Sequence, residues 1–250
     1  EKNNNKYGMA SVYHQLGIIA ETQRAFDQAE EWYRKSLAIK EEQKDKHGMS
    51  LSYHGLGVIA QEQGEFYQAE RWYRKSLEIT ERQGNFYVMA MTFYQLGTMA
   101  QECQQVAQAE HYYHKSLAIF EKQYSEHESA IVYRQIGIIA QERQDLAQAE
   151  QWYRKSLVIF EKQGNEHEAA TTYGPLGVLA AQRSFFVEAI RWLIQALVIF
   201  LDKQNHHFAQ IALSNIAQCF QQADDQQKAT IRELWQETGL GDLPGLTDND

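Results

Sequence analysis

The amino-acid sequence predicts an all-α solenoid, built as a stack of antiparallel helix hairpins. Its main support is an internal repeat: residues 137–160 read GIIAQERQDLAQAEQWYRKSLVIF, and close copies precede them at forty-residue intervals. Apolar residues inside each copy recur at steps of three and four, the spacing of one helix face. Only two prolines interrupt the 250 residues. A fixed period of this size is typical of arrays whose units bury their apolar faces against their neighbours.

Composition sets the outer limits of this prediction. The chain is 44% hydrophobic and 23% charged, which permits a packed core. Its net charge of −9 argues against nucleic acid as a partner, because phosphate binding needs clustered Lys and Arg. We find neither an apolar run of membrane-spanning length nor an amino-terminal signal segment. Cys103 and Cys219 lie far apart, so we expect two buried or half-buried thiols in a reducing compartment, the cytoplasm.

The period also predicts the domain organisation. The opening residues EKNNNKYGMA correspond to residues 161–170, where one repeat ends and the next begins, so we expect an upstream domain or further repeats before them. The expected divisions are five repeats (1–43, 44–83, 84–123, 124–163 and 164–204), a degenerate sixth repeat or cap (205–238) and a flexible tail (239–250).

In repeat one we expect a first helix over residues 8–23, joined by a short polar turn to a second helix over 26–43. Val12 and Ile19 form a second apolar stripe on the first helix, which predicts burial on two sides. Long helices joined by short turns pack antiparallel. The residues expected to face the core are Ala10, Tyr13, Leu16, Gly17 and Ala20 on the first helix, and Ala29, Tyr33, Ser36, Leu37 and Lys40 on the second.

A glycine recurs inside the first helix of every repeat, where it costs about 1 kcal/mol relative to alanine. We therefore expect a compensating close approach, with a ring such as Tyr73 lying against the backbone at Gly57. Ala69 and its equivalents do the same for the second helix. On the opposite face Glu70 precedes Arg74 by four residues, an exposed ion pair to which we assign no function.

The last repeats depart from the pattern. Gly174-Pro175 lies inside the first helix of repeat five, where proline removes a hydrogen-bond donor and usually kinks the helix. The following helix, from Ile190, is apolar nearly all round, which predicts burial on more than one side. Residues 209–222 and 226–238 fit the two helices of the sixth unit. Their expected core residues are Leu213, Ile216, Ala217, Phe220, Ala229, Leu234 and Trp235.

Each unit carries an aromatic residue, then Leu-Gly, Ala, Ala, a second aromatic and Ser at fixed spacing. This pattern resembles the tetratricopeptide repeat, over residues 7–200 strongly and 206–238 weakly. Two features differ: the period is forty rather than thirty-four, and the usual proline at the end of the second helix is absent. The longer period is similar to that of kinesin light chain and of bacterial signalling proteins. In repeat two the matching residues are Tyr53, Leu56, Gly57, Ala60, Ala69, Tyr73 and Ser76.

The resemblance implies a right-handed superhelix whose first helices line a concave groove for a peptide or protein. The groove positions differ between repeats while the packed positions agree, as expected of a surface that contacts different parts of one ligand; drift of an exposed face would look the same. The predicted partner-binding residues are His14, Ile18, Leu51, His54, Val58, Gln61, Met91, Tyr94, Thr98, Gln101, Ile131, Arg134, Ile138, Gln141 and Thr171, with Ser11 and Val178 beside them.

The predicted groove is apolar with one cation, Arg134. An asparagine that grips a terminal carboxylate in some relatives is replaced here by residues such as Val58, so that binding mode is not expected. Glu62, Glu102 and Glu142 form an acidic stripe, which fits a ligand with basic residues or is ordinary solvated surface.

No catalytic, cofactor or metal motif is present. Histidines recur where the first helices begin, but stacked helices lie about 8–10 Å apart, too far to share one ion at a Zn–N distance of about 2 Å. We assign these histidines to the start of each helix. They are His47, His127, His167 and His207.

The leading hypothesis is a non-enzymatic interaction module, the sensor or scaffold part of a larger protein. The alternative is a structural solenoid that self-assembles into a dimer or filament through its ends or through the apolar helix 190–201. An RNA-reading solenoid is disfavoured by the acidic balance.

Overall fold

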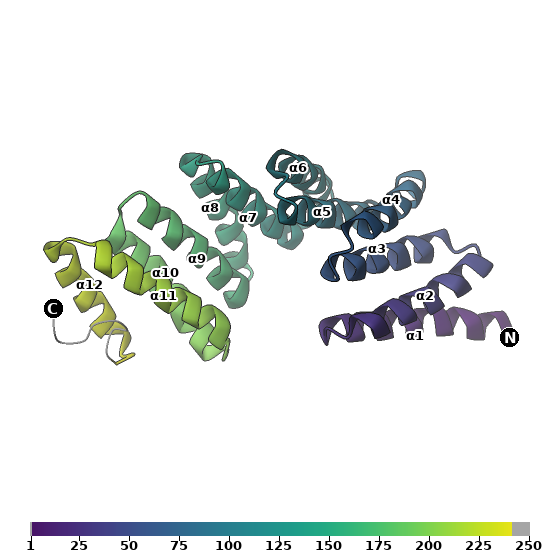
Figure 1. The fold of residues 1–250 in the computed structure, drawn as a ribbon, viewed down its shortest axis with the longest axis horizontal. Helices are drawn as coiled ribbons and strands as arrows, with labels where there is room; N and C mark the ends of the chain where they lie inside the picture. The colour runs from purple at the N-terminus through teal and green to yellow at the C-terminus, as the bar shows by residue number, and fades with distance from the viewer. Residues whose placement is uncertain (1, 242–250) are drawn as a thin grey trace. The chain divides into compact units, whose positions relative to one another are not determined.

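The computed structural model describes residues 2–241 of the 250, with side chains from residue 8 onward. Most of the predicted tail, residues 242–250, lies outside this range. The described residues are all-α, as predicted, with no strand (Figure 1). The helices are α1 (Lys2–Thr22), α2 (Phe26–Glu42), α3 (Lys46–Glu62), α4 (Phe66–Gln83), α5 (Phe86–Glu102), α6 (Val106–Lys122), α7 (Glu126–Glu142), α8 (Leu146–Lys162), α9 (Glu166–Gln182), α10 (Phe186–Asp202), α11 (His206–Gln222) and α12 (Asp225–Thr238).

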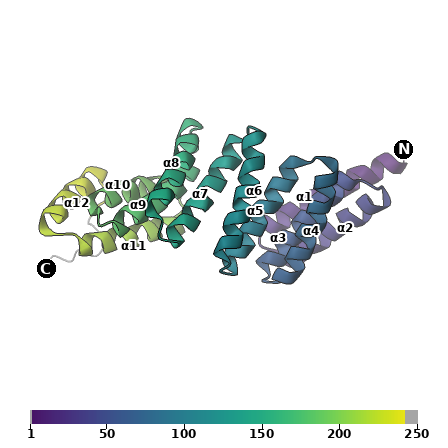
Figure 2. The ribbon, with the colours of Figure 1, turned by 90° about the horizontal axis from the view of Figure 1, so that it is seen from above.

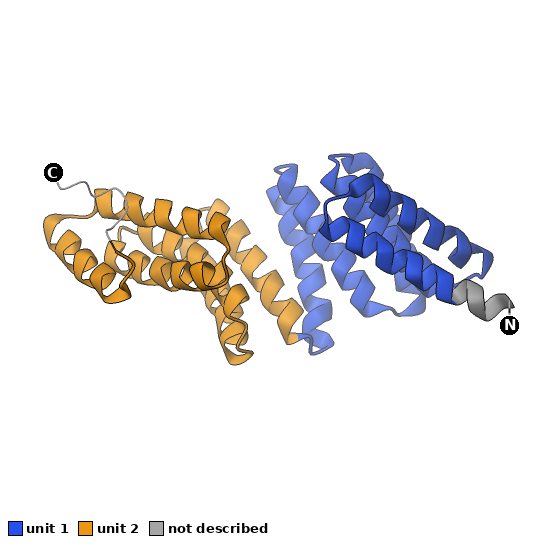
Figure 3. Ribbon diagram, turned by 90° about the horizontal axis from the view of Figure 1, so that it is seen from below, with its two compact units in different colours: residues 1–125 blue, residues 126–250 orange. Residues whose placement is uncertain are grey.

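The chain divides into two compact units, residues 1–125 and 126–250 (Figure 3). In unit 1 the hairpins α1–α2, α3–α4 and α5–α6 follow one another, and each second helix contacts the next first helix (Figure 2). Unit 2 repeats this arrangement with α7–α8 and α9–α10. Its last two helices, α11 and α12, both pack against α10. First helices also contact each other within a unit, α3 with α1 and α5, and α9 with α7 and α11.

The short turns that join α1 through α11 share one pattern, a left-handed residue two positions before the next helix begins. After α2 the chain takes a left-handed residue, Lys44, and the Asp45 amide donates to the Lys40 carbonyl at 2.9 Å, which satisfies an otherwise unpaired helix end. The Asp45 carboxylate then caps α3 by accepting from the Gly48 amide at 3.0 Å. Gly84 supplies the left-handed residue after α4, with φ +68°.

The predicted close approach between glycine and tyrosine is confirmed. A methyl group added at Gly137 of α7 would lie 2.6 Å from Tyr153 Cδ1 of α8. Tyr153 is completely buried, as are Ala149 and its equivalents in the other hairpins. Each of the first four hairpins is therefore held by a ring that lies directly on the backbone of its first helix. The tyrosines that fill this position in the first four hairpins are Tyr33, Tyr73, Tyr113 and Tyr153.

One predicted apolar stripe is wrong in the first helix and right in the others. Val12 and Ile19 are 56% and 50% exposed on α1, whereas Ile59 of α3 is buried. The second helix of the preceding hairpin covers this side of α3, and no helix in the described part of the chain covers it on α1. In α12 the predicted core residue Ala229 is exposed, and Ile231 is buried instead.

Repeat five packs as a central element of unit 2. Ile190, Leu193 and Leu197 of α10 are completely buried, because α9, α11 and α12 pack around this helix. The prediction of burial on several sides is confirmed, and these residues are not available for self-assembly. α9 runs without interruption through Pro175 rather than ending there.

No helix among the described residues has both the length and the apolar character needed to cross a membrane. Cys103 is half-buried and Cys219 is buried, both as free thiols, as predicted.

Candidate functional site

The predicted groove residues of unit 1 range from exposed to buried. On α1, Ile18 is exposed and His14 half-buried. On α3, His54 and Gln61 are 9% and 7% exposed, so they are core residues in this structure. The remaining predicted positions on α3 and α5 are half-buried. They are Leu51, Val58, Met91, Tyr94, Thr98 and Gln101.

A repeated glutamine holds the hydroxyl of the wedged tyrosine. Tyr73 Oη donates to Gln61 Oε1 at 2.9 Å, and Tyr153 Oη donates to Gln141 Oε1 at 2.7 Å. Each glutamine then reaches the next repeat: Gln61 Nε2 donates to Glu102 at 3.1 Å. These side chains satisfy buried polar groups, and this structural role explains the recurrence of glutamine at this position.

In repeats two and three the residue seven positions before this glutamine covers the same tyrosine ring. The His54 ring lies 6.0 Å from the Tyr73 ring, and Tyr94 lies 5.7 Å from Tyr113. His54 Nδ1 also lies 3.1 Å from Thr92 Oγ1. Burial lowers the pKa of His54 to about 4, with a smaller contribution from the nearby His14.

Repeat four breaks this arrangement, because Arg134 turns towards α9. Its Nη1 donates to Glu168 Oε2 at 2.7 Å and to the Thr171 hydroxyl, and its guanidinium lies 5.7 Å from the Phe160 ring centroid. The side chain is 14% exposed. The predicted groove cation is therefore already paired within unit 2, and it links α7 to α9.

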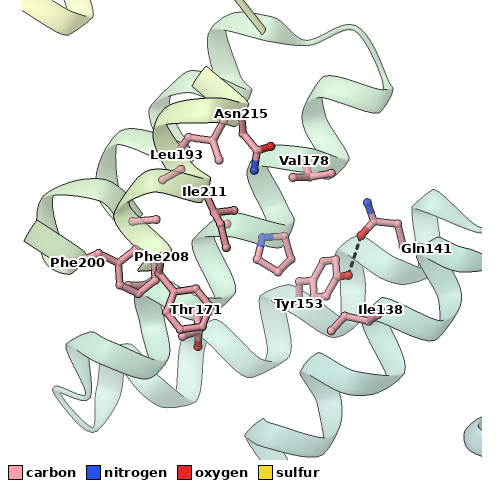
Figure 4. Close-up of a pocket in the computed structure, with 15 residues that line it drawn as sticks. Ile138, Gln141, Tyr153, Thr171, Val178, Leu193, Phe200, Phe208, Ile211 and Asn215 are labelled. Carbon is pink, nitrogen blue, oxygen red and sulfur yellow. Dashed lines mark hydrogen bonds between the residues drawn. The ribbon is translucent and has the colours of Figure 1, made fainter. Parts of the chain in front are cut away.

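Beside Arg134 lies a pocket of about 350 Å³ within unit 2 (Figure 4). First helices α7, α9 and α11 form its walls, and Tyr153, Leu193 and Phe200 of the second helices contribute to its floor. The lining is almost entirely apolar. The predicted groove residues Ile138, Gln141, Thr171 and Val178 line it; Ile131 is half-buried on α7 and does not. The other lining residues are Ala170, Gly174, Pro175, Ala196, Phe208, Ile211, Ala212 and Asn215.

The pocket exists because repeat five lacks the side chains that fill this place elsewhere. Gly174 stands where His54 and Tyr94 cover a ring, and a methyl group added there would meet nothing within 4 Å apart from its own stretch of helix. Leu193 replaces the tyrosine that would carry that ring. Two departures from the repeat, each unremarkable alone, together leave an apolar hollow.

Sequence reasoning missed the wall contributed by α11. Phe208 and Ile211 are 40% and 44% exposed, large apolar side chains at the pocket rim. Asn215 adds a carboxamide to the lining (Figure 4). A signal was present: Ile211 stands forty residues after Thr171, in register with the predicted groove positions.

The acidic stripe and the helix-start histidines lie outside the pocket lining. Glu62, Glu102 and Glu142 are exposed, and Glu62 lies 3.8 Å from Arg24. His127 and His167 pack edge-on against Phe160 and Phe200, which gives these helix-start histidines a structural role. Among the described residues no group of three or more His, Cys, Asp or Glu is placed to hold a metal ion.

Comparisons with known proteins agree with the repeat pattern. A family model of the tetratricopeptide repeat matches residues 5–83 and 88–162. A search of curated protein sequences found no significant match.

Three solved structures illustrate the likeness in fold. A Signal Transduction ATPase with Numerous Domains (STAND) from Pyrococcus horikoshii, which has a tetratricopeptide repeat sensor, superposes with a TM-score of 0.78 at 17% identity; the match covers 94% of this chain and 36% of that protein. BtubC (BKLC) from P. vanneervenii gives 0.63 at 18% identity over 97% and 95% of the two chains. The apo form of RapI gives 0.64 at 15% identity over 90% and 85%.

Proposed function

Because the chain belongs to the tetratricopeptide repeat family, a family of protein-interaction scaffolds, we propose that it binds a peptide or protein segment. The segment lies along the first helices and inserts an apolar side chain into the pocket of unit 2. The observation that carries this proposal is the pocket itself: about 350 Å³, apolar, and rimmed by the exposed Phe208 and Ile211. Burying one large apolar side chain there would contribute about 1.5–3 kcal/mol.

The proposed role is binding and not catalysis. The polar side chains around the pocket hold the fold together: Gln141 accepts from Tyr153 and donates to Gln182, and Arg134 is paired with Glu168. They form a rigid frame that positions the apolar lining, as expected of a pre-formed binding site.

The acidic stripe supports a basic residue elsewhere in the same ligand. Glu142 is exposed on α7 of unit 2, and exposed carboxylates attract and orient a cationic segment more than they add affinity. The structural likeness to a STAND sensor supports a sensor or scaffold part of a larger protein, since this chain spans 36% of that one. The two free thiols favour a reducing compartment such as the cytoplasm.

The test is selection of peptides against the whole chain, followed by a pocket-filling variant. Gly174→Tyr introduces the residue that occupies this place in repeat three, and no atom outside its own stretch of helix would lie within 4 Å of the added Cβ. Because Pro175 disfavours a helical residue with a Cβ directly before it, circular dichroism first checks that the variant keeps its helix content. We expect the selected peptides to bind this variant at least about tenfold more weakly, because the anchor site is filled.

The matched control is Val158→Tyr, which adds the same ring at a position that is 62% exposed on α8 and outside the pocket. It should leave affinity unchanged. Selected peptides that bind Gly174→Tyr as tightly as the parent chain would show that the pocket is not the anchor site.

A further inference from the structure

The wall of this pocket contains the one proline in a helix of the described residues. Pro175 lies in the interior of α9, where proline destabilises a helix because it has no amide hydrogen and its ring crowds the preceding turn. The equivalent positions are Gly55, Gln95 and Gln135, all of which have an amide hydrogen. Repeat five is therefore the place where this backbone donor is missing.

The missing donor has a defined partner. In an α-helix the amide of residue 175 would donate to the carbonyl of residue 171, four positions earlier. With proline at 175, the Thr171 carbonyl oxygen does not receive this bond. The two residues lie on the same helix face, and both line the pocket together with Val178. The Thr171 carbonyl oxygen therefore lacks its usual helical donor on the face of α9 that lines the pocket.

The neighbouring side chains are engaged in other bonds. The Thr171 hydroxyl donates to the Glu168 carbonyl at 2.8 Å and accepts from Arg134. Gln141 bonds Tyr153 and Gln182. In the empty pocket water can donate to the Thr171 carbonyl. A ligand that expels this water without replacing its hydrogen bond would lose about fivefold to 150-fold in affinity.

We infer that the pocket selects a tryptophan side chain, whose indole N–H donates to the Thr171 carbonyl oxygen while its rings fill the apolar cavity. This inference rests on the proposed function and specifies its anchor. Tryptophan combines a large apolar surface with a group that only donates, so it needs no donor from the apolar wall. Leucine or phenylalanine fills the cavity but leaves the carbonyl without a donor.

The experiment compares two probes on the whole chain: N-acetyl-tryptophanamide and its 1-methylindole analogue, which lacks the indole donor. Binding is followed by NMR at the methyl groups of Ile211 and Val178, which line the pocket. The second comparison is Pro175→Ala, which restores the backbone donor to Thr171. Alanine at this position should also raise the melting temperature, because it is a better helix former.

We expect the parent chain to bind the indole probe at least about fivefold more tightly than the methylated probe. In Pro175→Ala this ratio should fall towards one while the helix becomes more stable, so that affinity and stability change in opposite directions. Because both probes experience any change in pocket shape, the change in ratio isolates the hydrogen bond.

Two results would overturn the inference. A ratio near one in the parent chain, or a ratio that Pro175→Ala leaves unchanged, means that the Thr171 carbonyl does not select the anchor; the pocket then remains a binding site for apolar side chains. Failure of both probes to shift the Ile211 and Val178 methyl signals contradicts the pocket itself, and the proposed function fails with it.

Discussion

Repeat two in unit 1 and repeat five in unit 2 share the same helix hairpin, but repeat two is filled where repeat five has a pocket. In repeat two the Tyr73 ring lies on Gly57 of α3, and His54 covers the ring, so side chains of the repeat itself fill the space beside the ring. In repeat five Leu193 lies on Gly177, and Gly174 carries no side chain to cover it. The hairpin backbone is kept in both, but one closes its surface and the other leaves a pocket.

The difference shows how a repeat protein gains a site without a new element. The glycine that admits the second helix is retained, so helix packing is preserved in both repeats. Variation at Gly174, Pro175 and Leu193 then changes the side chains that line the pocket. The positions that agree between copies hold the array together, and three that disagree, Gly174, Pro175 and Leu193, line the pocket.

The largest effect we predict is the loss of stability when the buried tyrosine of repeat two is removed, compared with the removal of an exposed tyrosine of the same repeat. Tyr73→Ala should lower the free energy of unfolding by about 3–5 kcal/mol, because it removes a completely buried ring and leaves the Gln61 carboxamide without its donor. Urea denaturation monitored by circular dichroism measures the change. Tyr67→Ala, at a residue 76% exposed, should change stability by less than about 0.5 kcal/mol. Similar small values for both would contradict the wedge role of Tyr73.

The second prediction concerns the loss of stability at low pH. Repeat two has a buried histidine, His54, where repeat five has Gly174, so this contribution is present in repeat two and absent from repeat five. Burial lowers the pKa of His54 to about 4 from 6.5, so the unfolded chain binds a proton first as pH falls. Stability is therefore retained above pH 6.5 and lost between there and the folded pKa. From pH 8 to pH 5 the loss attributable to His54 is about 2 kcal/mol.

The variant His54→Tyr takes the residue of repeat three and should remove this part of the pH dependence. His111→Tyr, at an exposed histidine on α6, is the matched control and should not. Urea denaturation at several pH values measures both. An unchanged slope between pH 8 and pH 5 in His54→Tyr would mean that His54 is not the group that titrates.

The sequence correctly predicted the packing within a single hairpin. The approach of Tyr73 to Gly57 and the complete burial of Ala69 follow from size and helical spacing inside a single unit, and both are confirmed. The burial of Val12 was wrong because it depends on a neighbouring helix, and no described helix packs on that side of α1. Residue spacing within a helix carries no information about such a neighbour.

The binding groove was harder to predict, because it depends on several helices together. Ile138 and Thr171 were placed on the groove by register and do line one pocket, whereas His54, chosen by the same rule, is buried. Whether they bind a ligand stays a prediction. The pocket itself requires both α11 and the absence of a side chain at Gly174. In the sequence, Gly174-Pro175 predicted only a kink in the helix, and α11 was not placed beside it.

The smallest effect we predict tests the comparison most directly, since it is the same substitution with opposite signs. Gly57→Ala drives a methyl group into the Tyr73 ring, at a cost of about 1–3 kcal/mol that the better helix propensity of alanine offsets by about 1 kcal/mol, for a net loss of up to about 2 kcal/mol. Gly174→Ala is made in a Pro175→Gln background, because proline disfavours a helical residue with a Cβ directly before it. There the added methyl group meets open space and should stabilise α9 by up to about 1 kcal/mol relative to that background. Thermal and urea unfolding of the two variants gives the signs. A loss at Gly174 equal to that at Gly57 would mean that the glycine of repeat five is also needed for packing, and that the pocket is not a vacancy left by a missing side chain.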